Sequence, residues 1–215
     1  MHIEFLVEDS SGAKAVNILL PAVIGPQGTP HTWKIHEYKG VGRLPDGLST
    51  TTDPAKRALL NQLPRLLSGY GKTPGIDAVV VVLDTDRRDC VTFLSELKAI
   101  LGKCKPAPKT IFRLAIEEME SWFLGDKKAV LAAYPKAKKD VLSRYKQDSI
   151  CGTWEVLADA VHPGGSAAII NAGWPLPGQV KHDWANQICP KIDVELNKSP
   201  SFCKFRDGLR KLINL

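Results

Sequence analysis

Residues 77–89 read DAVVVVLDTDRRD, and the expected fold follows from this segment. Residues 79–83 form an unbroken run of β-branched and aliphatic side chains, a pattern typical of a strand buried on both faces in a parallel sheet. The run ends in Asp84 and Asp86. Alternate residues of a strand point to the same side, so we expect the two carboxylates to converge where the strand leaves the sheet. That edge is where ligands bind in open α/β sheets.

Asp84 and Asp86 also indicate a metal-binding site. Two carboxylates held close together repel each other, and a hard cation such as Mg²⁺ or Mn²⁺ relieves that repulsion. Arg87 and Arg88 follow directly and supply donors suited to phosphate oxygens. A turn followed by a helix N-cap explains the same aspartates equally well, because Asp is common at both positions. This segment alone leaves both interpretations open.

Strand and helix patterns alternate along the first part of the chain, up to Gly125. Short apolar runs are separated by segments in which apolar residues recur with helical spacing. This alternation predicts an α/β fold, a three-layer domain around a parallel sheet of about four strands with right-handed crossovers. The expected strands are residues 2–7, 33–38, 79–83 and 109–114, and the expected helices are residues 13–24, 55–67, 89–101 and 116–124.

Local signals mark the ends of several expected elements. Ser10 or Ser11 is predicted to cap the first helix, and Asp89 the helix after the buried strand. Residues 40–52 are rich in Gly, Ser and Thr, which favours a long loop, and Asp53-Pro54 is typical of a helix start.

Residues 126–215 have a different pattern from the first part. They indicate short helices at 127–133, 136–145, 153–161, 181–189 and 201–213. We therefore expect an α/β domain at 1–125 and a helical extension at 126–215 packed on it. The extension has 14 basic and 9 acidic residues, whereas residues 1–125 have 15 and 14. A basic excess of this kind is usually a solvated helix face, and less often a surface for a polyanion.

The amino-acid composition indicates a globular protein without a membrane span. Hydrophobic residues make up 44% and charged residues 24%, which is ordinary for a globular protein. The longest apolar runs are too short to cross a bilayer, and the first residues lack the basic start of a signal peptide. We expect a cytoplasmic protein with no membrane association. The five cysteines are scattered without a CxxC pair, which argues against a zinc ribbon.

A third carboxylate is expected beside the two aspartates. Glu8 lies one residue past the first strand, and if the first and third strands are neighbours it shares one edge with Asp84 and Asp86. Another acidic group follows the fourth strand. On a helix, Glu117 and Glu120 would share a face with Arg113, so either glutamate could be a fourth metal ligand. Compensation of the helix dipole explains these glutamates as well.

The order of these motifs resembles the Toprim domain of primases, topoisomerases and OLD-type nucleases. The resemblance rests on Val7-Glu8-Asp9 before a helix and on Asp84-Thr85-Asp86 after a buried strand. The segments LDTDRRDC, EMESWFLGD and NKSPSF extend it over nearly the whole chain, as in an uncharacterised Toprim-related domain of bacteria.

The resemblance implies a function for these residues. Glu8 would act as general acid or base and metal ligand, with Asp84 and Asp86 binding Mg²⁺ or Mn²⁺ and Glu120 as the fourth ligand. The implied activity is a metal-dependent nuclease in phage defence or repair, working on nucleic acid. The chain has no P-loop, and the resemblance allows a partner ATPase encoded separately. Asp9 departs from the family pattern, since many members carry Gly there, and it could crowd the approach to Glu8.

Two other functions stay open at this point. One is a nucleic-acid-binding or regulatory subunit that has lost its chemistry, and the other is a phosphatase acting on a small substrate. A basic groove leading away from the acids would favour a polymer, and a closed pocket would favour a small molecule. Arg87, Arg88 and Lys14 are the expected phosphate contacts, although ion pairing explains Lys14 more simply. His182 could transfer protons, but a surface histidine is the simpler interpretation.

Overall fold

The structure is a computed structural model that describes residues 1–44 and 58–214. The predicted helix start at Asp53-Pro54, most of the predicted 40–52 loop and the first residues of the predicted 55–67 helix lie outside the described residues.

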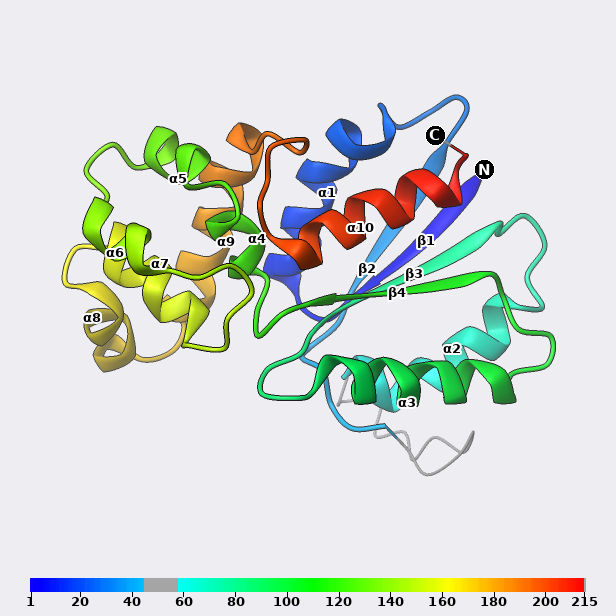
Figure 1. Ribbon diagram of the computed structural model, residues 1–215. Coiled ribbons are helices and arrows are strands. Elements are labelled where there is room, and N and C mark those ends of the chain that lie inside the picture. Colours follow the sequence, from blue (N-terminus) through cyan, green and yellow to red (C-terminus); the bar gives the residue numbers. More distant parts are fainter. Residues whose placement is uncertain (45–57, 215) are drawn as a thin grey trace.

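Four parallel strands form the sheet and confirm the expected α/β class (Figure 1). They are β1 (His2–Val7), β2 (Thr32–Glu37), β3 (Ala78–Asp84) and β4 (Thr110–Ala115). Their order is β2-β1-β3-β4, so β1 lies beside β3 as expected. Val7 is level with Val82 in this pairing, which brings the carboxyl ends of the two strands together.

Helices account for most of the remaining described chain. Each of the five predicted segments of the extension is helical over most of its length, and residues 165–172 form a helix that the sequence did not predict. The helices are α1 (Ser10–Ile24), α2 (Leu59–Tyr70), α3 (Cys90–Lys103), α4 (Glu120–Leu124), α5 (Lys127–Ala133), α6 (Lys139–Arg144), α7 (Thr153–Val161), α8 (Gly165–Ala172), α9 (Leu176–Ile188) and α10 (Pro200–Leu212), with a 3₁₀ turn η1 (Cys189–Lys191).

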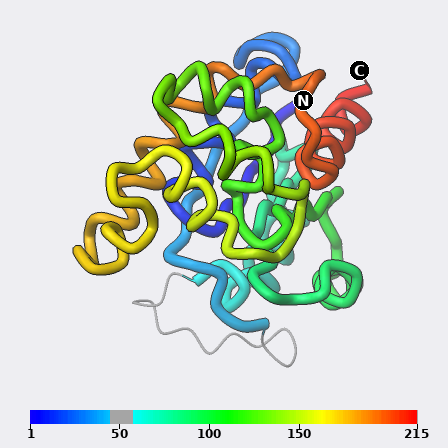
Figure 2. The backbone as a smooth tube through the Cα atoms, turned by 60° about the vertical axis from the view of Figure 1, so that its left-hand side comes forward, coloured from blue at the N-terminus to red at the C-terminus, as the bar shows by residue number. Residues whose placement is uncertain are grey.

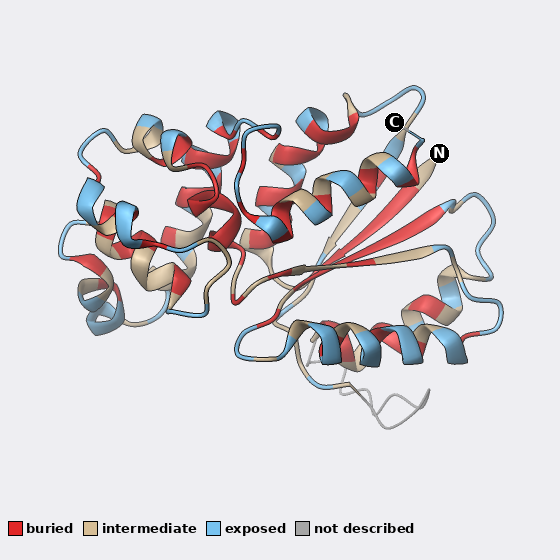
Figure 3. Cartoon of the chain, viewed as in Figure 1, coloured by how far each residue is buried: buried red, intermediate tan, exposed pale blue. Residues whose placement is uncertain are grey.

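The sheet is buried on both faces, as the run of valines predicts. Val80 and Val82 of β3 belong to the core that includes residues of α1 and α10, while Val79 and Val81 belong to the core with α2 and α3. Alternate strand residues thus supply opposite layers. The central strands are buried along most of their length (Figure 3).

Two aspartates cap the helices that follow β1 and β3. Asp89 Oδ1 accepts the amide of Thr92 at 2.9 Å, which confirms the predicted cap of α3. Asp9 Oδ1 accepts the amide of Gly12 at 2.6 Å, so the cap of α1 is Asp9, and the prediction of Ser10 or Ser11 is wrong. The helix begins earlier than the apolar spacing indicated, and both serines lie inside its first turn.

The extension is joined to the sheet through a common core. Trp122 of α4 contacts Phe202 and Phe205 of α10, and its indole nitrogen donates to Ser201 Oγ at 3.0 Å. The buried residues of this core come from both sides of Gly125. Helix α10 thereby returns to the sheet and supplies part of one of its three layers, with its end close to the start of β1 (Figures 1 and 2).

Arg113 of β4 and Gly208 of α10 lie in close contact. The guanidinium of Arg113 on β4 lies so near Gly208 that a Cβ atom there would collide with it. Glycine weakens a helix interior, so its presence in α10 is explained by this approach.

The helices α4 to α9 lie beyond the carboxyl ends of the strands (Figure 1). Among the described residues, no helix is both long and apolar enough to cross a membrane.

Candidate functional site

Glu8 and Asp84 meet at the carboxyl edge of the sheet. The amide of Glu8 continues the ladder by donating to Val82 O at 3.2 Å. Its carboxylate then crosses to β3, where Glu8 Oε2 accepts the amide of Asp84 at 3.0 Å. The expected approach of these two residues is therefore present, and it follows from the β1–β3 register.

The environment of the two carboxylates disfavours their charged forms and raises the pKa of both. Burial raises the pKa of Glu8 to about 7, and the charges of Asp86 and Asp9 add to the rise, while the Asp84 amide and Arg88 oppose it. Burial also raises the pKa of Asp84 well above its usual range, and Glu8 and Glu120 contribute further. Both groups are thus held where negative charge is costly, which is common at functional sites.

Asp86 does not share the strand face of Asp84. The strand ends at Asp84, Thr85 is fully buried, and Asp86 lies in the left-handed region with φ 50°. Its amide donates to Glu117 O at 2.9 Å and its side chain is exposed. The expected convergence by strand alternation is therefore wrong, because alternation ends with the strand. Asp86 nevertheless lies close enough to Glu8 to raise the pKa of that carboxyl.

Residues 116–119 form a turn, so the predicted helix at 116–124 begins only at Glu120. Glu117 has φ 60° and its carboxylate accepts the backbone amides of Cys151, Gly152 and Thr153 at 2.8–3.1 Å, together with the Thr153 hydroxyl. Glu117 thus holds the start of α7. The expected shared helical face of Arg113, Glu117 and Glu120 is absent, because Arg113 lies within β4.

Glu118 and Glu120 face a lysine from the extension. Lys181 Nζ of α9 lies 3.6 Å from Glu118 Oε1 and 3.5 Å from Glu120 Oε2. Burial raises the pKa of Glu118 to about 7, with Lys181 opposing the rise. Burial alone would lower the pKa of Lys181, but the carboxylates of Glu120, Glu118, Asp84 and Asp9 raise it above its ordinary value.

We name the group Glu8, Asp84, Glu118 and Glu120 the acidic rim. The ammonium of Lys181 supplies positive charge to this rim. The sequence pattern did not single out Lys181, since nothing near it in the chain links it to the acids. The adjacent His182 reaches the start of α1, where its Nε2 lies 2.8 Å from Ser10 Oγ.

The predicted phosphate contacts have different environments. The Arg88 guanidinium lies 4.7 Å from the centre of the Phe93 ring and 3.9 Å from Asp86 Oδ2, and its buried Nη1 has no hydrogen-bond partner among the described residues. Arg87 is exposed beside it. Lys14 lies on the exposed side of α1 and makes no ion pair within the part of the chain that the structure describes.

The carboxylate oxygens of the acidic rim are suitable ligands for a hard divalent cation. Carboxylate oxygens are the preferred ligands of Mg²⁺ and Mn²⁺. Within residues 1–44 and 58–214, Glu120 Oε2 is buried without a hydrogen bond, and burial and nearby acids raise the pKa values of Glu8 and Asp84. Across residues 1–44 and 58–214, however, no three His, Cys, Asp or Glu side chains already stand in the arrangement that holds a metal ion. The carboxylate ligands therefore suit Mg²⁺ or Mn²⁺, but the ammonium of Lys181 lies beside Glu118 and Glu120.

Comparison of the chain with protein-family models, with curated proteins and with solved structures gives no match. The Toprim resemblance therefore stays a prediction from the sequence motifs, and any function has to be argued from the acidic rim itself.

Proposed function

We propose that this protein is an Mg²⁺- or Mn²⁺-dependent hydrolase of phosphodiester bonds in nucleic acid. The observation that carries the proposal is the contact between Glu8 and Asp84 at the carboxyl edge of β1 and β3, with the pKa of both carboxyls raised. Such a half-buried pair of carboxylates costs stability when charged, and a divalent cation with a phosphate substrate would compensate it.

Each residue of the acidic rim has a role in this proposal. Glu8, Asp84 and Glu120 would hold the cation, because the pKa values of Glu8 and Asp84 are raised and Glu120 Oε2 has no hydrogen bond among the described residues. A bound metal in such a site supplies Lewis acidity and an activated water. Glu8, with a pKa of about 7, is suited to move a proton at neutral pH. Asp86 keeps Glu8 basic, and its own exposed carboxylate stays available at the mouth of the site.

Arg87 and Arg88 would hold phosphates next to the reacting one. Both follow β3 directly, and Arg88 has a buried donor without a partner among the described residues. Guanidinium groups bind phosphate oxygens with two parallel hydrogen bonds, which suits them to a nucleic-acid backbone. An ATPase encoded separately remains the proposed partner, by the family resemblance alone.

Lys181 favours a second candidate function. Its ammonium provides the positive charge for Glu118 and Glu120 that a metal would otherwise provide. A subunit that binds nucleic acid without cutting it could keep its acidic residues folded in this way. Under this alternative the Glu8 carboxylate has no chemical role.

The test is the effect of Glu8→Gln on cleavage and on binding. The variant keeps the size of the side chain and an acceptor for the Asp84 amide, but removes its charge and basicity. General acid–base help is worth about 10²–10⁴ in rate, so Mn²⁺-dependent cleavage of plasmid, single-stranded DNA and RNA should fall by that range. Affinity for nucleic acid should hold or rise, because a negative charge is lost.

Glu37→Gln is the matched control. Glu37 is an exposed carboxylate at the end of β2, on the same edge of the sheet, and its substitution should leave cleavage unchanged. If the wild-type protein binds nucleic acid but does not cut it, with or without any ATPase that is encoded next to it, the second candidate replaces the enzyme. If Glu8→Gln cuts as well as Glu37→Gln, the proposed role of Glu8 is wrong.

A further inference from the structure

A cavity opens on the helical extension, away from the acidic rim. Its volume is about 780 Å³, within the range of roughly 300–1,000 Å³ that is usual for small-molecule sites. Its lining comes from the start of α5, from Gln147 and from the segment between α9 and α10. Gly125, which follows α4, belongs to the lining, whereas Glu120 of the rim begins α4. The cavity and the rim therefore lie at opposite ends of this short helix.

The cavity is lined by four lysines, and we call it the lysine pocket. They are Lys127, Lys128, Lys191 and Lys198. The last three are exposed, and Lys127 Nζ donates to Tyr145 O at 3.1 Å. In the described parts of the chain, none of the four lysines forms an ion pair with a carboxylate. Positive charge gathered in a concave site attracts anions from solution.

Two aspartates also line the pocket, but their oxygens bond to the backbone. Asp126 Oδ1 accepts the amides of Lys128 and Ala129, both at 3.1 Å, and its Oδ2 accepts the amide of Asp193 at 2.9 Å. Asp193 Oδ1 accepts two amides of the following turn at 2.9 and 3.1 Å. Four ammonium groups against two carboxylates leave a formal excess of two positive charges in the lining.

Hydrogen bonds fix the walls of the pocket on one another. The amide of Lys198 donates to Gly125 O at 2.9 Å, and a Cβ atom on Gly125 would collide with Asn197 Oδ1. Gln147 Nε2 donates to Leu124 O at 3.2 Å. Segments that are far apart in the sequence are thus joined around the cavity. A frame that is ordered before a ligand arrives lowers the cost of binding.

The lining also includes exposed apolar surface. Leu196 is 64% exposed and lines the pocket together with Ala132, which is exposed as well. Covering such surface is favourable in water. A bare inorganic anion would leave Leu196 uncovered, so the lining favours an anion that carries an organic part.

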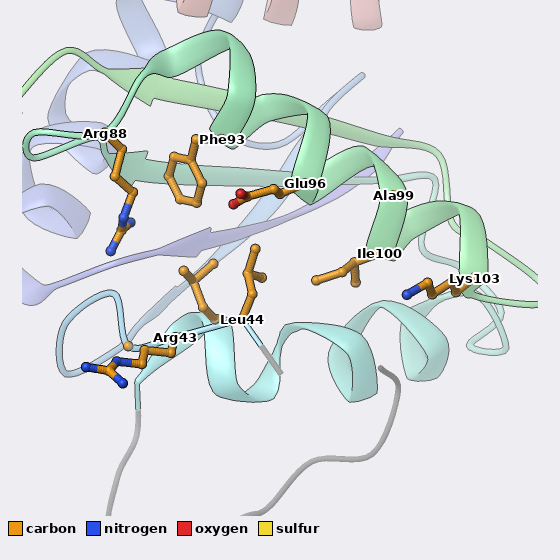
Figure 4. A pocket seen from close by; sticks show the side chains of 10 residues that line it. Arg43, Leu44, Arg88, Phe93, Glu96, Ala99, Ile100 and Lys103 are labelled. Carbon is orange, nitrogen blue, oxygen red and sulfur yellow. The ribbon is translucent and has the colours of Figure 1, made fainter. Parts of the chain in front are cut away.

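The groove along α3 provides a contrast (Figure 4). Basic residues line this groove too, but its apolar side chains Leu60, Phe93 and Ile100 are only 2–5% exposed. These side chains belong to the core between the sheet and its helices, and they leave almost no surface for a ligand. In the lysine pocket, by contrast, both the charged and the apolar side chains are accessible.

We propose that the lysine pocket binds a small organic molecule with two or more linked phosphate groups, such as a nucleoside polyphosphate. A phosphate group carries up to two negative charges at neutral pH, so linked phosphates match several ammonium groups in one small pocket. The phosphate oxygens would accept hydrogen bonds from Lys128, Lys191 and Lys198, and the organic part would cover Leu196. This site is separate from the acidic rim and does not depend on the proposed function.

The test compares Lys128→Ala/Lys198→Ala with Lys136→Ala/Lys139→Ala. All four are exposed lysines of the extension, but only the first pair lines the pocket, so the two double variants match in charge and in type of substitution. The probes are ATP and tripolyphosphate, which lacks the organic part. Calorimetric titrations in EDTA at constant ionic strength measure binding, and thermal melting without a probe first shows that both variants are folded.

ATP should bind to the wild-type protein, and tripolyphosphate should bind more weakly. Lys128→Ala/Lys198→Ala should weaken ATP binding about tenfold, because two charge-assisted hydrogen bonds are lost. Lys136→Ala/Lys139→Ala should change it less than twofold. The proposal is overturned if the wild-type protein binds neither probe at millimolar concentration, if both double variants have the same effect, or if tripolyphosphate binds as tightly as ATP.

Nucleic acid is another source of linked phosphates, and a separate titration distinguishes it. Single-stranded and duplex oligonucleotides should bind to Lys128→Ala/Lys198→Ala as tightly as to the wild-type protein. If oligonucleotide binding falls in this variant and ATP does not bind, the lysines serve a polymer and the pocket proposal is wrong. Glu8→Gln should leave ATP binding unchanged, so a failure of nucleic-acid cleavage and a failure of ATP binding are told apart.

Discussion

Glu117 and Glu8 are both glutamates just past the end of a strand, at the same edge of the sheet. Their carboxylates differ in their hydrogen-bond partners and in the direction of their pKa shifts. Glu117 accepts three backbone amides and a hydroxyl at the start of α7. Burial would raise the pKa of Glu117, but the bonds from Thr153, Gly152 and Cys151 lower it below its usual value. Glu8 accepts the single amide of Asp84, and its pKa rises to about 7.

These two carboxylates differ in their hydrogen-bond donors and in the charges around them: Glu117 accepts four hydrogen bonds, whereas Glu8 accepts the Asp84 amide and lies near the charges of Asp86 and Asp9. A charged group with all its oxygens hydrogen-bonded holds structure together, and its charge is stabilised. A buried group with few donors costs stability and is kept for another reason, which is the basis for reading Glu8 as functional. The comparison predicts that removing the two carboxylates changes stability in opposite directions.

Glu117→Ala should cause the largest change. The four hydrogen bonds at about 1 kcal/mol each predict a loss of about 4 kcal/mol in the free energy of unfolding, measured by urea denaturation at neutral pH. Asp140→Ala is the control, because Asp140 makes an exposed ion pair with Arg144 and should cost under about 1 kcal/mol. If Glu117→Ala costs no more than this control, Glu117 does not hold α7 and the comparison fails.

Glu8→Gln should stabilise the protein without metal, and the gain should depend on pH. The folded-state pKa of Glu8 is about 7, above its ordinary value of 4.5, so the folded wild type binds the proton more tightly than the unfolded chain. Its stability therefore falls as pH rises from 4.5 through 7, and levels off above that. At pH 8 the variant should be more stable by up to about 3 kcal/mol, and below the ordinary pKa the gain should vanish.

Melting curves of wild type and Glu8→Gln in EDTA at several pH values measure this difference. A constant difference across the whole range would show that Glu8 ionises normally. The rim would then hold no costly charge at this position.

Lys181→Met should cause the smallest change of the three. It removes the ammonium from Glu118 and Glu120 while keeping most of the side-chain volume, and the unpaired acids should cost about 2 kcal/mol, less than a fully buried pair because Lys181 is partly exposed. Without the lysine, the rim depends more on an added cation. The rise in melting temperature with Mn²⁺ should thus be larger in Lys181→Met than in wild type, and an identical rise would show that Lys181 does not compete for the metal.

The fold could be predicted because its signals are local. The run at residues 79–83 identifies a buried central strand, and the alternation of strands and helices defines a parallel sheet. The contact of Glu8 with Asp84 then follows from the adjacency of β1 and β3.

The rest of the site could not be predicted, because it depends on the turn at Glu117 and on contacts from the extension. A left-handed backbone at Asp86 and Glu117 leaves no periodic pattern in the sequence. Lys181 reaches the acids from α9, far along the chain, through the packing of the extension. Glu8, Asp84 and Glu120 of the rim were therefore found from the sequence, but Glu118 and Lys181 were not.

The return of α10 to the sheet has a consequence for the order of synthesis. Ribosomes add roughly 5–20 residues per second, so α10 follows β4 by on the order of ten seconds. Until then, the Arg113 side of β4 and the Trp122 surface lack the helix that covers them. The sheet therefore completes its folding only after α10 has been made, and a nascent chain that stops before α10 presents an apolar face to chaperones. A side chain at Gly208 would accordingly reduce the yield of folded protein in cells, while the chemistry of the rim in the molecules that do fold stays unchanged.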